Sequence, residues 1–144
     1  MKLLKDIIYG IRIIEIKGNT NIAVENITFD SREINNLSLF IAVKGVSQDG
    51  HNFISQAQNS GACAIICESL PEILNDEITY IKVLDSSKSL GIVASNFFDN
   101  PSEKLKLVGI TGTNGKTTCA TLLYDLYRLM GYKTGLISTV HIKI

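Results

Sequence analysis

One stretch limits the possible folds of this 144-residue chain more than any other. It reads Gly109-Ile110-Thr111-Gly112-Thr113-Asn114-Gly115-Lys116-Thr117-Thr118, and it lies between an apolar run, residues 105–108, and a helical apolar pattern that ends near Met130. Glycines in such a loop let several backbone N–H groups approach one anion, and the helix that follows adds the positive end of its dipole. The stretch therefore predicts a phosphate-binding loop between a buried strand and a helix.

The last residues of this loop predict separate roles toward a nucleotide. Lys116 supplies a mobile cation for the β and γ phosphate oxygens, and the hydroxyl of Thr117 suits a Mg²⁺ ion held between those phosphates. The usual spacing has a first glycine where Ile110 stands, so the common form of the motif is not matched literally. A glycine-rich turn without a ligand is the alternative interpretation.

The segment after the loop has the pattern of a helix over residues 117–130. Gly131 stands where a left-handed C-cap belongs, and residues 133–138 predict one more strand. The apolar side chains that recur at helical spacing are Cys119, Leu122, Leu123, Leu126 and Met130, and we expect this stripe to be buried. A P-loop domain needs further strands and an acidic Mg²⁺ ligand. These do not follow here, so we expect an N-terminal fragment, and its oligomeric state is left open.

The composition is that of a globular chain without a general affinity for polyanions or membranes. Hydrophobic residues make up 45% and charged residues 19%, which excludes a disordered or collagen-like chain. Fourteen basic and fourteen acidic residues cancel, so neither nucleic acid nor a membrane surface is an expected partner. Three cysteines fit a reducing cytosol, and no apolar run has the form of a transmembrane segment or a secretory signal. We therefore expect a cytoplasmic location.

The first hundred residues alternate between strand and helix patterns, which makes the class α/β. An amphipathic helix is predicted over residues 2–9, with its apolar stripe in a core rather than on a membrane. The other predicted elements are strand 24–29, strand 39–43, a helix from Phe53 to Gly61, strand 62–67, strand 79–84, and a helix capped by Asp85 or Ser86 whose buried face includes Val93, Phe97 and Phe98. A polar stretch after this helix separates two predicted domains, 1–100 and 105–144.

Two sets of motifs resemble one enzyme family, the Mur ligases, which form amide bonds in peptidoglycan precursors. The loop Gly112-Thr113-Asn114-Gly115-Lys116-Thr117-Thr118 resembles the nucleotide loop of that family, although folylpolyglutamate and cyanophycin synthetases carry relatives of it. The segments Phe29-Asp30-Ser31-Arg32, Leu39 to Gly45, Asp49 to Ile54 and Gly61-Ala62 resemble, in this order, the N-terminal domain of the members that add the third residue or the final dipeptide. The resemblance covers nearly the whole chain.

The resemblance implies a fold and a set of site residues. The fold is an N-terminal mixed-sheet UDP-binding domain followed by the first strand, loop, helix and strand of a P-loop ATPase domain. Residues Phe29, Ser31, Val46, Ser47 and Gln48 would contact the UDP end of the UDP-N-acetylmuramoyl peptide. Residues Gly112, Thr113, Asn114, Gly115, Lys116, Thr117 and Thr118 would bind ATP, with Lys116 as the catalytic residue and Thr117 as the Mg²⁺ ligand. Arg32 could pair with a phosphate or with Asp30, and His51 is predicted to be a structural turn residue.

The activity that the resemblance implies is ATP-dependent ligation through an acyl phosphate. The substrates would be UDP-N-acetylmuramoyl-L-alanyl-D-glutamate and a diamino acid, either meso-diaminopimelate or L-lysine. Thr113, Pro101-Ser102 and Ser138-Thr139-Val140 favour the members that add this third residue, and the dipeptide-adding members are the alternative. A non-catalytic P-loop nucleotide-binding module is an alternative from a different class of protein. The fragment alone is expected to be inactive.

Overall fold

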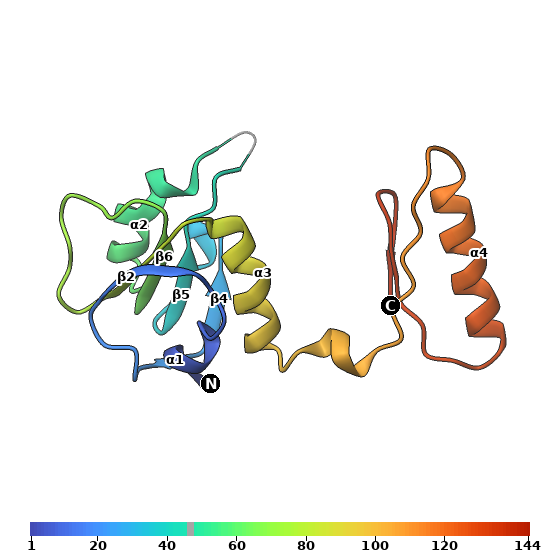
Figure 1. Cartoon of the computed structure of the whole chain (residues 1–144), viewed down its shortest axis with the longest axis horizontal. Coiled ribbons are helices and arrows are strands. Elements are labelled where there is room, and N and C mark those ends of the chain that lie inside the picture. Colours follow the sequence, from blue (N-terminus) through green and yellow to red (C-terminus); the bar gives the residue numbers. More distant parts are fainter. Residues whose placement is uncertain (46–47) are drawn as a thin grey trace. The chain divides into compact units, whose positions relative to one another are not determined.

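The computed structural model describes residues 1–45 and 48–144. Contacts between backbone positions divide these residues into two compact units, Met1–Leu105 and Lys106–Ile144. Each unit has its own helices and strands (Figure 1). None of the described helices is long and apolar enough to cross a membrane.

The first unit is built on a mostly parallel sheet. Within the described residues the sheet has five strands in the order β2-β7-β6-β5-β4, and only β2 runs antiparallel to its neighbour. The bounds of the strands are β2 Ile13–Lys17, β4 Asn26–Thr28, β5 Ser38–Ile41, β6 Ala64–Cys67 and β7 Thr79–Val83. A second, two-stranded antiparallel sheet joins β1 (Lys2–Leu3) to β3 (Ala23–Val24).

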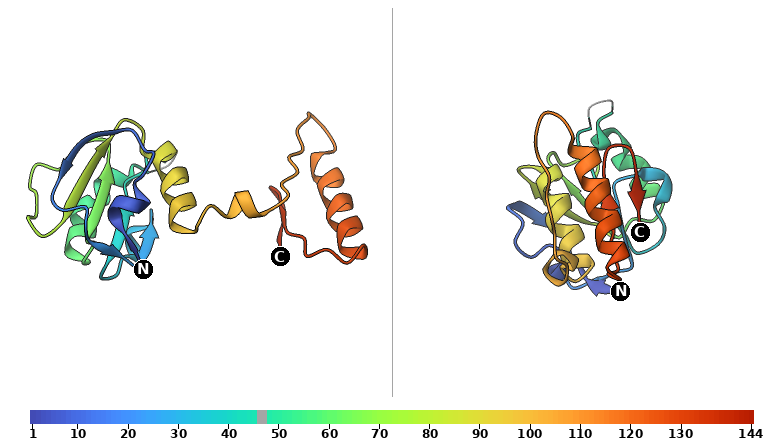
Figure 2. Two further views of the ribbon diagram at one scale, coloured as in Figure 1. Left: turned by 60° about the horizontal axis from the view of Figure 1, so that its bottom comes forward. Right: turned by 90° about the vertical axis from the view of Figure 1, so that its right-hand side faces the viewer.

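Helices cover both faces of the parallel sheet (Figures 1 and 2). The bounds of the helical segments are α1 Leu4–Ile7, η1 Ser31–Glu33, η2 Gly50–Phe53, α2 Ile54–Asn59, α3 Ser86–Phe97 and η3 Pro101–Lys104, where η marks a short 3₁₀ helix. The α2 helix packs on the face formed by Phe40, Ile65 and Tyr80, which lie side by side in the strand register. The α1 and α3 helices pack on the opposite face. The result is a layered α/β/α unit.

The central strands β5 and β6 are apolar apart from Ser38, because both of their faces are covered. All four residues of β6 are buried, and so are all four residues of β5. Parallel strands with helices on both faces read as continuous apolar runs, which is the pattern that predicted the strands 39–43 and 62–67. Both are confirmed with slightly shorter bounds, as is the helix that Asp85 caps through the backbone N–H of Lys88 at 2.9 Å.

Several predictions for the first unit are wrong in detail. The predicted helix 2–9 is helical only over Leu4–Ile7, although its apolar stripe is buried as expected. The predicted strand 24–29 is divided into β3 and β4, and Phe98 is exposed instead of buried. The β2 strand was not predicted, because all five of its residues are exposed and it has no buried face to produce an alternating pattern.

The second unit contains one long helix and a hairpin. The α4 helix spans Lys116–Leu129, and the strands β8 (Leu136–Ile137) and β9 (Ile142–Lys143) pair antiparallel. Gly131 has a φ of 86° and donates its N–H to the carbonyl oxygen of Arg128. The N–H of Tyr132 donates to the carbonyl oxygen of Tyr127. These two bonds form a Schellman motif, so the predicted glycine C-cap is confirmed.

Two predictions for the second unit are wrong. Residues 105–108 do not form a strand, and Leu105, Leu107 and Val108 are exposed, because no described segment of this unit pairs with them. The predicted apolar stripe of α4 is also mostly exposed, including Cys119, and the buried residue of that helix is Tyr124. The loop and helix are therefore present without the predicted strand in front of them.

We predict opposite effects for alanine at two glycines of the first unit. A Cβ atom at Gly50 would lie 2.7 Å from both the backbone nitrogen and the carbonyl oxygen of Val43, whereas one at Gly91, inside α3, would meet nothing within 4 Å. Gly50→Ala should lower the free energy of unfolding by about 1–3 kcal/mol through overpacking. Gly91→Ala should raise it by up to about 1 kcal/mol through helix propensity. Urea denaturation measures both, and wild-type stability in Gly50→Ala would contradict the close approach.

Candidate functional site

Several polar residues of the first unit lie at one edge of its sheet. Because β4, β5, β6 and β7 are parallel, the segments that follow them all leave the sheet at the same edge. These segments contain Asp30 after β4, Lys44 after β5, Glu68 after β6 and Ser86 after β7. Ligands of open α/β sheets bind outside the carboxyl ends of the strands, so this edge is the candidate binding site.

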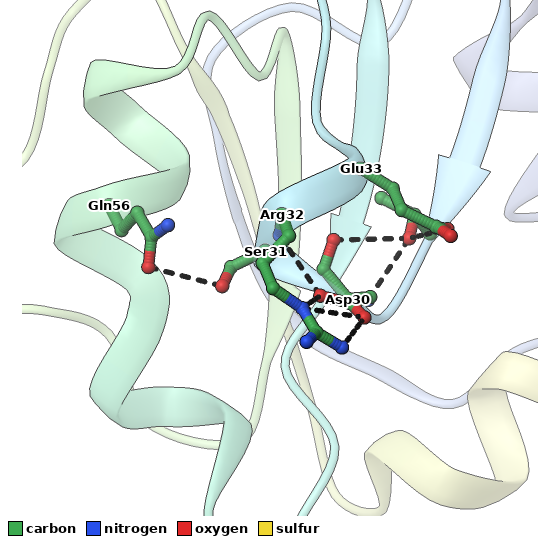
Figure 3. Close-up of polar contacts among 6 residues, drawn as sticks. Asp30, Ser31, Arg32, Glu33 and Gln56 are labelled. Atoms are coloured by element: carbon green, nitrogen blue, oxygen red, sulfur yellow. Dashed lines mark hydrogen bonds and ion pairs between the residues drawn. The ribbon is translucent and has the colours of Figure 1, made fainter.

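The turn after β4 is held by a bidentate ion pair (Figure 3). A carboxylate oxygen of Asp30 accepts the backbone N–H of Arg32 at 3.0 Å, and the guanidinium of Arg32 donates to both carboxylate oxygens, from Nε at 2.9 and 3.1 Å. These hydrogen bonds lower the pKa of Asp30 to about 2. Of the two predicted roles of Arg32, the structure has the pairing with Asp30.

Phe29 and Ser31 stand on either side of Asp30 in the sequence, and they are the two predicted substrate contacts in this turn. Phe29, directly after β4, is 65% exposed. The hydroxyl of Ser31 donates to the side-chain oxygen of Gln56 in α2 at 3.1 Å (Figure 3). An exposed ring can stack on a base, and a hydroxyl oriented in this way can still accept a hydrogen bond.

The loop after β5 is closed at its base by backbone contacts. Lys44 and Asp49 form an antiparallel bridge, and the N–H of Gly45 donates to the carbonyl oxygen of Gln48 at 2.9 Å. Gln48 is exposed. The predicted contacts Val46 and Ser47 lie outside the described residues.

A network of polar side chains connects this loop with the ends of β6 and β7. The carboxylate of Glu68 pairs with the ammonium of Lys44 at 2.9 Å and accepts both the backbone N–H and the hydroxyl of Ser86 at 3.0 Å. The hydrogen bond from the Ser86 N–H is the main cause that lowers the pKa of the Glu68 carboxyl, and the hydrogen bond with Glu68 raises the pKa of Lys44. Sequence reasoning missed this network, because Lys44 and Glu68 are far apart in the chain.

His51 joins the same network through both ring nitrogens. Nδ1 lies 2.6 Å from a carboxylate oxygen of Asp49, and Nε2 accepts the backbone N–H of Glu68 at 2.9 Å. These contacts agree with the predicted structural role. Among residues 1–45 and 48–144, no cluster of three acidic, histidine or cysteine side chains could hold a metal ion.

The candidate phosphate loop is a separate site in the second unit. Gly112 and Gly115 have φ angles of 149° and 76°, and Gly115 is the N-cap of α4 without a side chain that caps the helix. The first N–H groups of α4 are therefore available to an anion. Lys116 bends back over the loop, and its ammonium donates to the carbonyl oxygens of Gly112 and, at 3.2 Å, of Thr113.

The other predicted nucleotide contacts lie along this loop and the first turn of α4. Thr113, Asn114 and Thr118 are exposed, and Thr117 is half-buried. The carbonyl oxygen of Thr117 accepts the hydroxyl of Thr121 at 2.9 Å, and no hydrogen bond of the Thr117 hydroxyl is found within the described part of the chain. One free hydroxyl fits Mg²⁺, which takes few protein ligands beside phosphate and water oxygens.

Comparison with known proteins finds diaminopimelate ligases among the relatives of this chain. The chain is 56% identical over 138 residues to the UDP-N-acetylmuramoyl-L-alanyl-D-glutamate--2,6-diaminopimelate ligase of Cytophaga hutchinsonii, which covers 95% of this chain and 28% of that protein. It is 52% identical over 140 residues to the ligase of the same name from Phocaeicola vulgatus, covering 97% of this chain and 29% of that protein. The chain thus spans less than a third of the length of these relatives.

Solved structures give a related result. A crystal structure of MurF from Acinetobacter baumannii matches with a TM-score of 0.57 and 32% identity, over 74% of this chain and 23% of that one. The MurF ligase of Thermotoga maritima, solved in complex with ADP, matches with a TM-score of 0.55 and 31% identity, over 74% of this chain and 24% of that one.

The family itself follows from the first unit. Residues 23–98, more than half of the chain, match the profile described as "Mur ligase family, catalytic domain". The matched range contains β3 to β7, most of the first unit's sheet, together with the polar residues at its carboxyl edge. The chain therefore belongs to the Mur ligase family.

Proposed function

We propose that this chain is the N-terminal part of an ATP-dependent ligase that adds a diamino acid to UDP-N-acetylmuramoyl-L-alanyl-D-glutamate. The observation that carries the proposal is the 56% identity to a ligase of this name over 138 residues, which extends across both units. The names of the relatives favour 2,6-diaminopimelate over lysine as the added residue. A cytoplasmic location belongs to the proposal and is supported by three free cysteines.

The two units would have different substrates. Residues 1–100 would form the domain that binds the UDP end of the muramoyl peptide, and residues 105–144 the start of the ATP-binding domain. In the first domain Phe29 would stack on the uracil, Ser31 would bond its polar edge, and Gln48, with Val46 and Ser47, would line the nucleotide. The exposure of Phe29 and the Ser31–Gln56 hydrogen bond support these assignments.

The ATP loop would act on the phosphoryl group that is transferred. The γ-phosphoryl group moves to the side-chain carboxylate of the D-glutamate, which yields an acyl phosphate and ADP. The amine then attacks the acyl carbon, and inorganic phosphate leaves. Lys116 would exchange the carbonyl oxygens of its own loop for phosphate oxygens, where its charge opposes the charge of the transferring group. Mg²⁺, held by Thr117, would neutralise further charge on the phosphates.

A second candidate is the ligase that adds the terminal dipeptide. It is favoured by the solved structures of that enzyme, which match at 31–32% identity. The identity to the diaminopimelate ligases is higher and covers more of the chain, so we rank the dipeptide-adding activity second. A non-catalytic P-loop module is the third candidate, and it would show no ligase activity.

We predict that UDP binds to the 144-residue chain through the turn after β4. Ser31→Ala should weaken UDP about two- to tenfold, because a neutral hydrogen bond contributes about 0.5–1.5 kcal/mol. Phe29→Ala should weaken it by a similar or larger factor, since stacking on an aromatic ring contributes about 1–3 kcal/mol per base. Calorimetric titration measures both. Ser87→Ala, at an exposed serine of α3, is the matched control and should leave the affinity unchanged. No loss in either variant would remove this turn from the site.

We predict that Lys116 is needed for ligation but not for UDP binding. A chimera in which this chain replaces the matching segment of the Cytophaga hutchinsonii ligase should ligate 2,6-diaminopimelate. Lys116→Ala in the chimera should lower the rate by about 10³-fold or more, because the cation acts on charge that develops in the transition state. Lys133→Ala, at an exposed lysine beyond α4, is the control. Ligation of a dipeptide instead would favour the second candidate, and an inactive but folded chimera would favour the non-catalytic module.

A further inference from the structure

Only one protonation state of His51 satisfies both contacts of its ring. The backbone N–H of Glu68 can only donate, so Nε2 must be an acceptor without a proton. In the neutral ring the proton is then on Nδ1, which donates it to the carboxylate of Asp49 at 2.6 Å. The side chain of His51 is 13% exposed. Both nitrogens are occupied, so the ring is unavailable as a base toward a substrate.

Both arms of the loop after β5 are anchored at the same residue. Lys44, in the first arm, pairs with the carboxylate of Glu68. Asp49, in the second arm, is linked through the His51 ring to the backbone N–H of Glu68. Glu68 is itself fixed, because its carboxylate also accepts two hydrogen bonds from Ser86 at the start of α3. The base of the loop is thereby held over the ends of β5, β6 and β7.

We propose that His51, with Asp49, is a positioning residue for the UDP site. The inference rests on the proposed UDP-binding function and deepens it. The ring holds the second arm of the loop at the sheet edge, which sets where the adjacent Gln48 lies relative to the nucleotide. His51 acts through the loop and does not contact UDP. Its effect is therefore on the affinity for UDP and not on the contacts of Phe29 and Ser31.

Titration of the 144-residue chain with UDP tests this role. His51→Phe keeps a planar ring but removes both hydrogen bonds, and we expect it to weaken UDP binding about tenfold. His51→Gln offers a side-chain oxygen to the Glu68 N–H, so it should recover part of the loss. The other of the two histidines, His141, is exposed in the second unit. The control variant His141→Gln should therefore bind UDP with unchanged affinity.

A second variant keeps the test decisive if His51→Phe does not fold. Asp49→Asn retains an oxygen for the backbone N–H of His51, which the Asp49 carboxylate accepts at 2.9 Å, but it loses the charge that faces Nδ1. We expect it to fold and to weaken UDP about threefold, the lower part of the range for one hydrogen bond. The proposal would be overturned if Asp49→Asn binds UDP with wild-type affinity while His51→Phe either binds with wild-type affinity or does not bind at all.

Nitrogen NMR of the imidazole ring tests directly the two hydrogen bonds on which the proposed role depends. We expect a proton on Nδ1 and none on Nε2 of His51 at neutral pH, with the His141→Gln variant used for assignment. A proton on Nε2 would overturn the proposed linkage.

The outcomes separate this inference from the function on which it rests. If the wild-type chain binds UDP and both the His51 and the Asp49 variants bind it equally well, the positioning role fails and the proposed function stands. If the wild-type chain does not bind UDP, the proposed function fails and the positioning role fails with it.

Discussion

The burial of both faces of the parallel sheet is the constraint on which the first unit depends. Strands β5 and β6 have no exposed residue, and the buried hydroxyl of Ser38, at the start of β5, is hydrogen-bonded to Asn35. Polar chemistry can then be placed only where the strands end, since a polar group inside this core would lose its hydrogen bonds with water. Four parallel strands bring four such ends to one edge. The clustering of Asp30, Lys44, Glu68 and Ser86 follows from this topology.

Charge at that edge is balanced locally. Arg32 is paired with Asp30, and Lys44 with Glu68, so each cation next to the candidate UDP site already has a carboxylate partner. A diphosphate bound there would compete with those carboxylates for the cations. Under the proposed function, the remaining contacts would be the exposed side chain of Phe29 and the Ser31 oxygen, which would recognise a nucleoside by stacking and hydrogen bonding. This balance is consistent with a chain of zero formal net charge.

The sequence predicted those parts of the molecule that depend on local pattern or on continuous burial. The apolar runs at residues 39–43 and 62–67, the Asp85 cap and the Gly131 C-cap all became the expected elements. Strand β2 was missed because it is exposed along its whole length. The network around Glu68 was missed because it depends on which strand ends become neighbours, and spacing in one sequence does not contain that information. Residues 105–108 have the apolar pattern of a buried strand, but a strand also needs a neighbouring strand to pair with.

The two candidate sites also differ in whether local sequence or neighbouring strands determine their shape. Two glycines and the first turn of α4 determine the shape of the phosphate loop, and all of them lie within residues 112–118. The loop therefore forms without the support of a sheet. The contacts of Lys116 show that the loop alone offers this cation no negatively charged partner. Its ammonium donates to two carbonyl oxygens of the loop, which satisfy it as neutral acceptors. A phosphate binds the ammonium more strongly than these carbonyl oxygens do mainly because it carries a negative charge. This electrostatic advantage is small where water screens it and large where water is excluded. Residues 111–116 of the loop are all exposed, so the second unit by itself leaves the loop in contact with water. Local sequence thus determines the shape of this site, whereas the strength of its electrostatics depends on what covers it.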